Sequence, residues 1–257
     1  MQPALFIVLE GTDGSGTTTQ GNLLAQSLRV AGHEVLRTAQ PSDGPIGVVL
    51  RAALRNEMGH RLDPVAVALL FAADRSDHCH RVIGPALARG EWVVCDRYLG
   101  SSLAFQVVDG DGTIDEAWVL ALNRHALVPD LSVLLDVPTD TAVGRIQERG
   151  KPRERFEIED TLRNVRQRYR QVFASPPERL GPAVVVEADR PRESVAREVL
   201  AHVQRRQAEV GLALATGDGE PVQRPAGLAP ASDDSPASGE KPASSDSPGD
   251  RDSVGQA

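Results

Sequence analysis

Five short, mostly apolar runs recur along the chain, and longer segments with apolar residues at every third or fourth position separate them. The runs cover residues 5–9, 34–38, 92–95, 131–135 and 183–186. Runs of this length are typical of strands buried in a parallel sheet. The intervening segments predict helices at residues 18–31, 46–55, 64–89, 115–127, 139–149, 158–174 and 191–210. The alternation predicts an α/β fold in which helices cover both faces of a five-stranded parallel sheet.

Glycine and proline residues mark where these helices are expected to bend or end. Gly84 and Pro85 predict a bend or break within residues 64–89. Gly211 predicts the end of the last helix.

The end of the chain differs in composition from the rest. From about residue 216 to 257 it is mostly Pro, Ser, Ala, Gly and Asp. Such a segment cannot bury enough apolar surface to offset its ordering entropy, so it is predicted to be disordered. We therefore expect one folded domain, residues 1–212, and an acidic tail, residues 213–257, that carries much of the net charge of −8. The nearly neutral domain argues against a nucleic-acid partner.

The cysteines and the apolar runs indicate the compartment. Cys79 and Cys95 are the only cysteines, and both lie inside regular segments, which argues against a disulfide framework or a zinc site. No apolar run approaches the roughly 18 residues of a membrane helix, and the first strand leaves no room for a signal segment before it. These features predict a cytoplasmic protein with no membrane partner.

A glycine-rich loop follows the first strand. It consists of Gly11, Thr12, Asp13, Gly14, Ser15, Gly16, Thr17 and Thr18. Its glycines let backbone N–H groups point into one concavity, and the helix that follows adds a partial positive charge, so the loop suits a phosphate. The P-loop signature has a lysine where this chain has Thr17. A glycine-rich turn that binds no ligand therefore stays an alternative for the loop by itself.

Three further polar signatures fall near the ends of the predicted strands or on the helices beside them, where an open α/β sheet binds its ligands. They are residues 69–75, ending in Asp74 and Arg75; Asp96, Arg97 and Tyr98 with residues 101–106; and the cations Arg145, Arg149, Lys151, Arg153 and Arg155. Taken singly, each has an ordinary structural explanation. Phe71 suits a core, Asp96 and Arg97 suit a simple ion pair, and a run of cations suits a solvated face.

Taken together, these motifs resemble the thymidylate kinases, a nucleoside-monophosphate kinase family of the P-loop class. The resemblance includes Pro129-Asp130-Leu131 and Leu135-Asp136-Val137-Pro138, and it extends from about residue 6 to 200. It implies a three-layer P-loop NTPase-type fold with a lid at about residues 145–157. It also implies phosphorylation of dTMP to dTDP for dTTP synthesis, by direct in-line transfer from ATP with Mg²⁺, in a cytoplasmic homodimer.

The resemblance also assigns roles to residues of this chain. Residues 11–18 match the ATP-binding loop, and Thr18 and Asp96 match the positions that hold Mg²⁺. The matches to catalytic positions are Asp13, Arg97, Arg149 and Arg153, of which Asp13 approaches the 3′-hydroxyl of the nucleotide and Arg97 the phosphate of dTMP. The remaining matches to the dTMP site are Phe71, Arg75, Ser102, Phe105 and Gln106. Phe105 stands where many members have a tyrosine that disfavours ribose.

Two positions depart from the family pattern. Thr17 removes the P-loop cation, and residues 38–41 lack the Arg and Glu of the usual Thr-Arg-Glu-Pro stretch. Losing one hydrogen bond to a charged group costs about 1.5–3 kcal/mol, or roughly a tenfold to hundredfold loss of rate. Two alternatives therefore stay open: a catalytically weak or inactive nucleotide-binding protein, and a kinase for another nucleoside monophosphate.

Overall fold

The computed structural model describes residues 4–148, 156 and 159–216. The expected lid cations at positions 149, 151, 153 and 155, and the expected tail beyond residue 216, lie outside the described residues. Arg149 and Arg153 therefore stay predictions.

The strands form a single parallel sheet in the order β2–β3–β1–β4–β5, which confirms the predicted architecture. The strands are β1 (Phe6–Glu10), β2 (Val35–Ala39), β3 (Trp92–Asp96), β4 (Leu131–Asp136) and β5 (Ala183–Glu187). The central strands β1 and β3 are buried along their whole length, whereas the edge strands β2 and β5 are partly exposed. All five lie within one residue of the predicted runs, because short apolar runs that alternate with amphipathic helices favour the strands of a parallel sheet.

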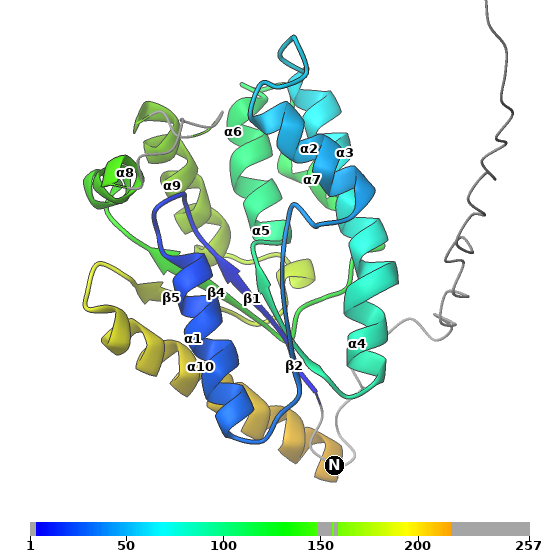
Figure 1. Ribbon diagram of the computed structural model, residues 1–257, viewed down its shortest axis with the longest axis vertical. Coiled ribbons are helices and arrows are strands. Elements are labelled where there is room, and N and C mark those ends of the chain that lie inside the picture. The colour runs from blue at the N-terminus through cyan, green and yellow to red at the C-terminus, as the bar shows by residue number, and fades with distance from the viewer. Residues whose placement is uncertain (1–3, 149–155, 157–158, 217–257) are drawn as a thin grey trace, which may run out of the picture.

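Helices cover both faces of the sheet (Figure 1). On one face α1 (Thr17–Val30) and α10 (Arg192–Thr216) pack against each other and against the strands, and on the other face lie α4 (Gly84–Ala88) and α9 (Glu159–Ala174). The pair α2 (Pro45–Leu54) and α3 (Pro64–His78) packs together beside the carboxyl ends of the strands. The remaining α-helices are α5 (Leu99–Ser101), α6 (Val107–Asp109), α7 (Glu116–Leu122) and α8 (Thr139–Glu148). Among the described residues, no helix is both long and apolar enough to cross a membrane.

The helices differ from the sequence prediction in three places. The helix predicted at residues 115–127 is shorter, because α7 ends at Leu122. The region 64–89 does not break at Gly84 and Pro85 but widens into a π-helical turn, Cys79–Ile83, and continues as α4. Pro85 lies in the first turn of α4, where its missing N–H does not interrupt the helix. Helix α10 passes Gly211 and reaches Thr216, since a single glycine costs only about 1 kcal/mol in a helix.

One helical segment has no counterpart in the sequence prediction. It consists of α5, a π-helical turn (Ser102–Gln106) and α6. Every residue of the π-helical turn is buried. A segment buried all round shows no amphipathic period, so periodicity could not identify it.

Candidate active site

The glycine-rich loop has the conformation that a phosphate cradle requires. Gly14 and Gly16 have φ angles of 82° and 95°, in the left-handed region that favours glycine. Any Cβ on Gly14 would collide with the carbonyl of Ala142 in α8, so the loop packs closely against that helix. Gly16 directly precedes α1, so the free N–H groups of the first turn of α1 open into the loop.

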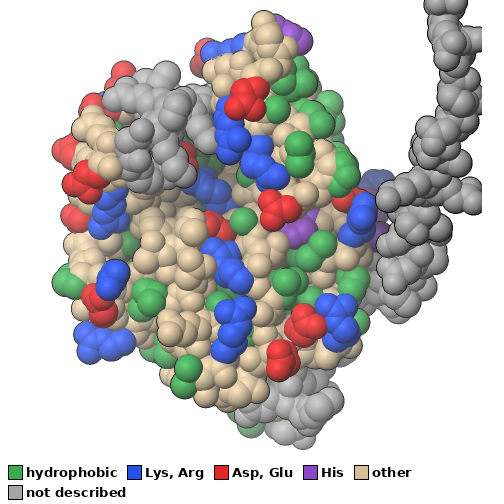
Figure 2. All heavy atoms as spheres, viewed as in Figure 1, with side chains coloured by type: hydrophobic (Ala, Val, Ile, Leu, Met, Phe, Trp, Pro, Cys, Tyr) green, Lys and Arg blue, Asp and Glu red, His purple; other side chains and the backbone are tan. Residues whose placement is uncertain are grey.

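Two adjoining cavities open at the carboxyl ends of the strands. The larger one has a volume of about 480 Å³ and is lined by most of the glycine-rich loop, by residues 39–41, and by Asp96, Arg97 and Arg145. The smaller one, about 90 Å³, is lined mainly by aromatic and polar side chains that include Phe71, Arg75, Phe105 and Gln106. Asp13 and Arg97 line both cavities. Figure 2 shows the hollow at this end of the molecule, with Arg side chains beside it.

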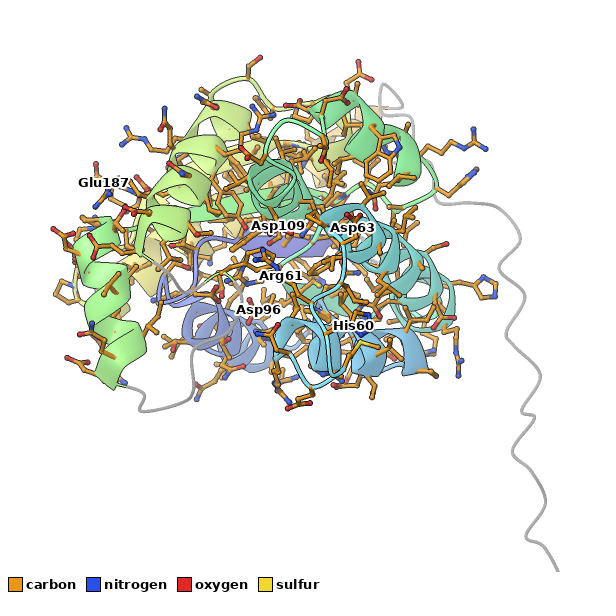
Figure 3. All side chains as sticks on the ribbon, turned by 90° about the horizontal axis from the view of Figure 1, so that it is seen from above. His60, Arg61, Asp63, Asp96, Asp109 and Glu187 are labelled. Atoms are coloured by element: carbon orange, nitrogen blue, oxygen red, sulfur yellow. The ribbon has the colours of Figure 1, made fainter. Side chains whose placement is uncertain are left out.

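A hydroxyl and a carboxylate meet at the floor of the larger cavity. Thr18 Oγ1 donates a hydrogen bond of 2.5 Å to Asp96 Oδ2. The second oxygen, Asp96 Oδ1, is buried and has no hydrogen-bond partner among the described residues. Seen from above in Figure 3, Asp96 lies in the interior beside α1, whereas Glu187, which ends β5, points outward. An unpartnered carboxylate oxygen next to a hydroxyl is a donor set that suits Mg²⁺.

Arg97 is fixed between the two cavities. Its Nη2 lies 2.8 Å from Asp13 Oδ1, and its guanidinium stacks on the ring of Phe105 at 4.9 Å from the centroid. The φ angle of Arg97 is 65°, a left-handed conformation that is costly for an arginine. Burial is the largest single influence on Arg97 and works against its charge, but the surrounding acidic groups, with Asp13 first, together outweigh burial and raise the pKa of Arg97. The side chain is therefore a permanent cation at the junction of the cavities.

Glu10 adds a buried negative charge near Arg97, and the sequence reasoning missed this residue. It ends β1 and is fully buried, where it accepts hydrogen bonds from Tyr98 N (3.0 Å), Ser101 Oγ (2.6 Å) and Tyr169 Oη (3.2 Å). Burial raises the pKa of Glu10, while the hydrogen bond from Ser101 and the charge of Arg97 lower it in part. The only signal in the sequence is an acid that ends an otherwise apolar run.

Arg75 is buried and makes most of its hydrogen bonds within the protein. Its Nε donates to Gln40 Oε1 (2.9 Å), its Nη1 to Asn123 Oδ1, and its Nη2 to the carbonyl of Tyr98 and to Ser102 Oγ (both 2.9 Å). These bonds use all but one of the N–H groups of the side chain. Ser102 thus binds Arg75 and does not line the smaller cavity. Sequence reasoning gave no partner role to Gln40 or Asn123.

The other predicted substrate residues lie together at the smaller cavity. Phe71 is half-buried and lines it, and Phe105 lies beside Phe156 with ring centroids 5.1 Å apart. Gln106 Oε1 is buried and has no hydrogen-bond partner among the described residues. Phe156 is a further lining residue that the sequence reasoning missed. The cavity therefore offers aromatic walls and a free acceptor, which suit a flat polar ring.

Arg145 is the one member of the expected cationic segment that the described residues include. Its Nη1 donates to the carbonyl of Gly14 (3.2 Å) and its Nη2 to the carbonyl of Ala188 (3.3 Å), while Asp189 lies 4.0 Å away. The guanidinium therefore lies over the outer side of the glycine-rich loop, at the rim of the larger cavity.

Comparisons with known proteins agree with one another. The family model described as thymidylate kinase matches residues 9–199. The chain is 43% identical over 176 residues to a Pyrococcus horikoshii protein named "Probable thymidylate kinase", and the matched region covers 67% of this chain and 84% of that protein. It is 39% identical over 211 residues to the thymidylate kinase of Afipia carboxidovorans, covering 79% and 90% of the two chains. It is 38% identical over 214 residues to that of Chromohalobacter salexigens, covering 81% and 99%.

Proposed function

The chain belongs to the thymidylate kinase family, and from that premise we propose how its two adjoining cavities transfer a phosphoryl group from ATP to dTMP. The enzyme is a dTMP kinase of nucleotide biosynthesis, and ATP is its phosphate donor. The observation that carries the proposal is the junction of the cavities. Arg97 and Asp13 line both of them, so a group bound in one cavity can reach a group bound in the other.

The larger cavity is proposed to bind the phosphates of ATP. Residues 12–14 and 16–18 of the loop line the cavity, and the N–H groups in the first turn of α1, which have no partner within the helix, would donate to phosphate oxygens. Arg145 lies at the rim and adds a positive charge on that side. The predicted lid cations Arg149 and Arg153 are proposed to steady the transferring group, and they belong to the catalytic set with Asp13 and Arg97.

The smaller cavity is proposed to hold dTMP. Arg97 would bind its phosphate bidentately, and the Asp13 carboxylate would accept from the 3′-hydroxyl. Phe71 would stack on the base, the free Gln106 Oε1 would accept its N–H group, and the remaining N–H of Arg75 would donate to a base carbonyl. Ser102 would act through Arg75, to which it is hydrogen bonded.

The donor set at Thr18 and Asp96 fits Mg²⁺, which we propose as the cofactor. The Thr18 hydroxyl and the free Asp96 Oδ1 would hold the ion together with the phosphates of ATP. Bound Mg²⁺ neutralises charge that develops on the phosphate oxygens. The protein supplies position and charge to both nucleotides, so transfer is in-line and needs no covalent intermediate on this chain.

We propose that the enzyme is a cytoplasmic homodimer. Both cysteines are free and buried, as in a reducing compartment. Exposed apolar side chains gather over α2, α3 and the π-helical turn after α3 (Figure 2), and they are Val48, Val49, Leu69 and Val82. Such a patch suits a second copy of the same chain.

Sedimentation equilibrium tests the homodimer. The expected mass is twice the chain mass of 27.5 kDa, because burying the apolar patch against a second copy removes it from water. The variant Leu69→Glu, which puts a charge into the patch, is expected to sediment as a monomer. A wild-type monomer at micromolar concentration would contradict the proposal.

A coupled assay of ADP release with several nucleoside monophosphates tests the function. Turnover with dTMP is expected to exceed that with dAMP or dGMP by roughly a hundredfold or more, because a cavity of about 90 Å³ walled by Phe71 and Phe105 suits a single ring. Comparable turnover with a purine nucleotide would mean a kinase of another specificity. Binding of dTMP without turnover would mean the weak nucleotide-binding protein that Thr17 suggests.

The same assay with dUMP and UMP examines the sugar. Phe105 has no phenolic hydroxyl, so discrimination against ribose depends on the bulk of a ring packed against Phe156. We expect dUMP to be preferred over UMP. Equal rates would show that Phe105 does not exclude the 2′-hydroxyl.

A further inference from the structure

We infer that Arg37 takes over the electrostatic role of the absent P-loop lysine, acting on the phosphate site from behind the loop through Asp96 and Thr18. The inference rests on the proposed function, because it concerns the same phosphate cavity. Arg37 does not line that cavity, so it is a positioning residue.

The guanidinium of Arg37 is held against the proposed metal acid. Its Nη2 lies 3.3 Å from Asp96 Oδ2, the oxygen that also accepts from Thr18. Its Nη1 donates to the carbonyls of Val94 (3.3 Å) and Thr38. The side chains of Arg37 and Asp96 are only 16% and 10% exposed, so water screens their interaction weakly. Two contacts, of 3.3 and 2.5 Å, thus link the cation to the hydroxyl of the phosphate loop.

The strand β2 explains why Arg37 reaches this place. Side chains two residues apart on a strand point to the same face, so Arg37 and Ala39 share a face of β2. Ala39 pairs with Asp96 in the sheet and lines the larger cavity. The Arg that the family pattern has at position 39 is missing. Arg37, two residues earlier on the same face of β2, instead reaches the carboxylate of Asp96.

Gly21 provides the space for this guanidinium. A Cβ on Gly21 would lie 2.6–2.7 Å from three atoms of the Arg37 guanidinium, so only glycine allows the observed contact. Thr17 and Gly21 are about one turn apart on α1 and therefore share a face. The guanidinium of Arg37 thus lies against α1 about one turn further along the helix than Thr17, the position of the P-loop lysine.

The charge balance around Asp96 gives this placement its meaning. In a loop with lysine, that cation would balance the negative charge of both the phosphates and the nearby carboxylate. Thr17 contributes no charge, and Arg37, which lies outside the cavity lining, balances the charge of Asp96 instead. Together with Thr18, Arg37 occupies Oδ2 of Asp96, a residue that lines the cavity, and Oδ1 keeps no hydrogen-bond partner among the described residues. The site keeps one cation next to this carboxylate, although its position has changed.

Arg37→Met is the first test, with Arg89→Met as the matched control. Arg89 is an exposed arginine paired with Glu91 at the far end of β3. Arg37→Met is expected to lower kcat roughly tenfold or more and to change the KM for dTMP less than about threefold. It is also expected to weaken ATP binding in EDTA, measured by calorimetry, by roughly fivefold. Arg37→Lys is expected to keep more activity than Arg37→Met, and the control is expected to match the wild type.

Two further variants separate this role from a structural one. Gly21→Ala displaces the guanidinium without removing it, and because alanine favours helix it is expected to lower kcat without lowering Tm. Thr17→Lys is expected to restore activity roughly tenfold when added to Arg37→Met, but to slow the wild type, since a second cation adds repulsion.

Several results would overturn the inference. Wild-type kcat and ATP affinity in Arg37→Met, wild-type kcat in Gly21→Ala, or no recovery on adding Thr17→Lys would each show that Arg37 does not replace the lysine. These outcomes presuppose an active wild type. A wild type that does not phosphorylate dTMP would instead contradict the proposed function, so the two failures are distinguishable.

Discussion

Replacing Arg97 with methionine is expected to lower kcat/KM for dTMP by roughly a thousandfold, because Arg97 is the one cation among the described residues that lines both cavities. Asp13 and the ring of Phe105 hold this guanidinium in a single orientation before any ligand binds. A preoriented cation costs no reorganisation when charge develops on the transferring group. Steady-state kinetics with dTMP and ATP measure the effect.

The variant Arg97→Lys refines this prediction. A lysine keeps the charge but loses the planar fork that binds a phosphate bidentately and stacks on Phe105, so most of the loss is expected to remain. Arg89→Met again serves as the control, since Arg89 lies outside both cavities. If Arg97→Met kept turnover within about tenfold of the wild type, the proposed role of Arg97 in transfer would be wrong.

Asp96→Asn is expected to lower kcat by roughly a thousandfold at saturating Mg²⁺ and to raise the Mg²⁺ concentration needed for half-maximal activity. Asparagine has nearly the same shape, but it replaces a buried, unpartnered carboxylate oxygen with a neutral group. The change also removes the ion pair with Arg37, so thermal unfolding is recorded alongside the kinetics.

The control for Asp96 is Glu187→Gln. Glu187 also ends a strand, but it is exposed and lies outside both cavities. We expect this control to leave kcat and the Mg²⁺ dependence unchanged. A loss in Asp96→Asn that followed the drop in Tm alone, with the Mg²⁺ dependence unchanged, would assign Asp96 a purely structural role.

The departures from the family pattern are less severe in three dimensions than in the sequence. Thr17 and Ala39 each lack a cation that the motifs lead one to expect. The structure places Arg37 on Asp96, and Arg145 over the loop at Gly14, so cations flank the phosphate cavity on two sides. This arrangement supports the kinase over the weak nucleotide-binding protein.

The sequence by itself determined the strands, the glycine-rich loop and the residues that follow β1 and β3. An apolar run is a local pattern, and short runs that alternate with amphipathic helices favour buried strands. Asp13, Thr18, Asp96 and Arg97 could be placed together for the same reason, because parallel strands bring their carboxyl ends to one edge of the sheet.

Only the tertiary structure decided which side chains are partners. Arg37 is 59 residues from Asp96 in the sequence, and the two meet because β3 lies between β2 and β1. Arg75 could be predicted near the substrate, but its bonds to Gln40 and Asn123 join segments that no local pattern connects. Periodicity reports whether a residue is buried, whereas strand order and helix packing determine what it is buried against, and those depend on contacts between distant parts of the chain.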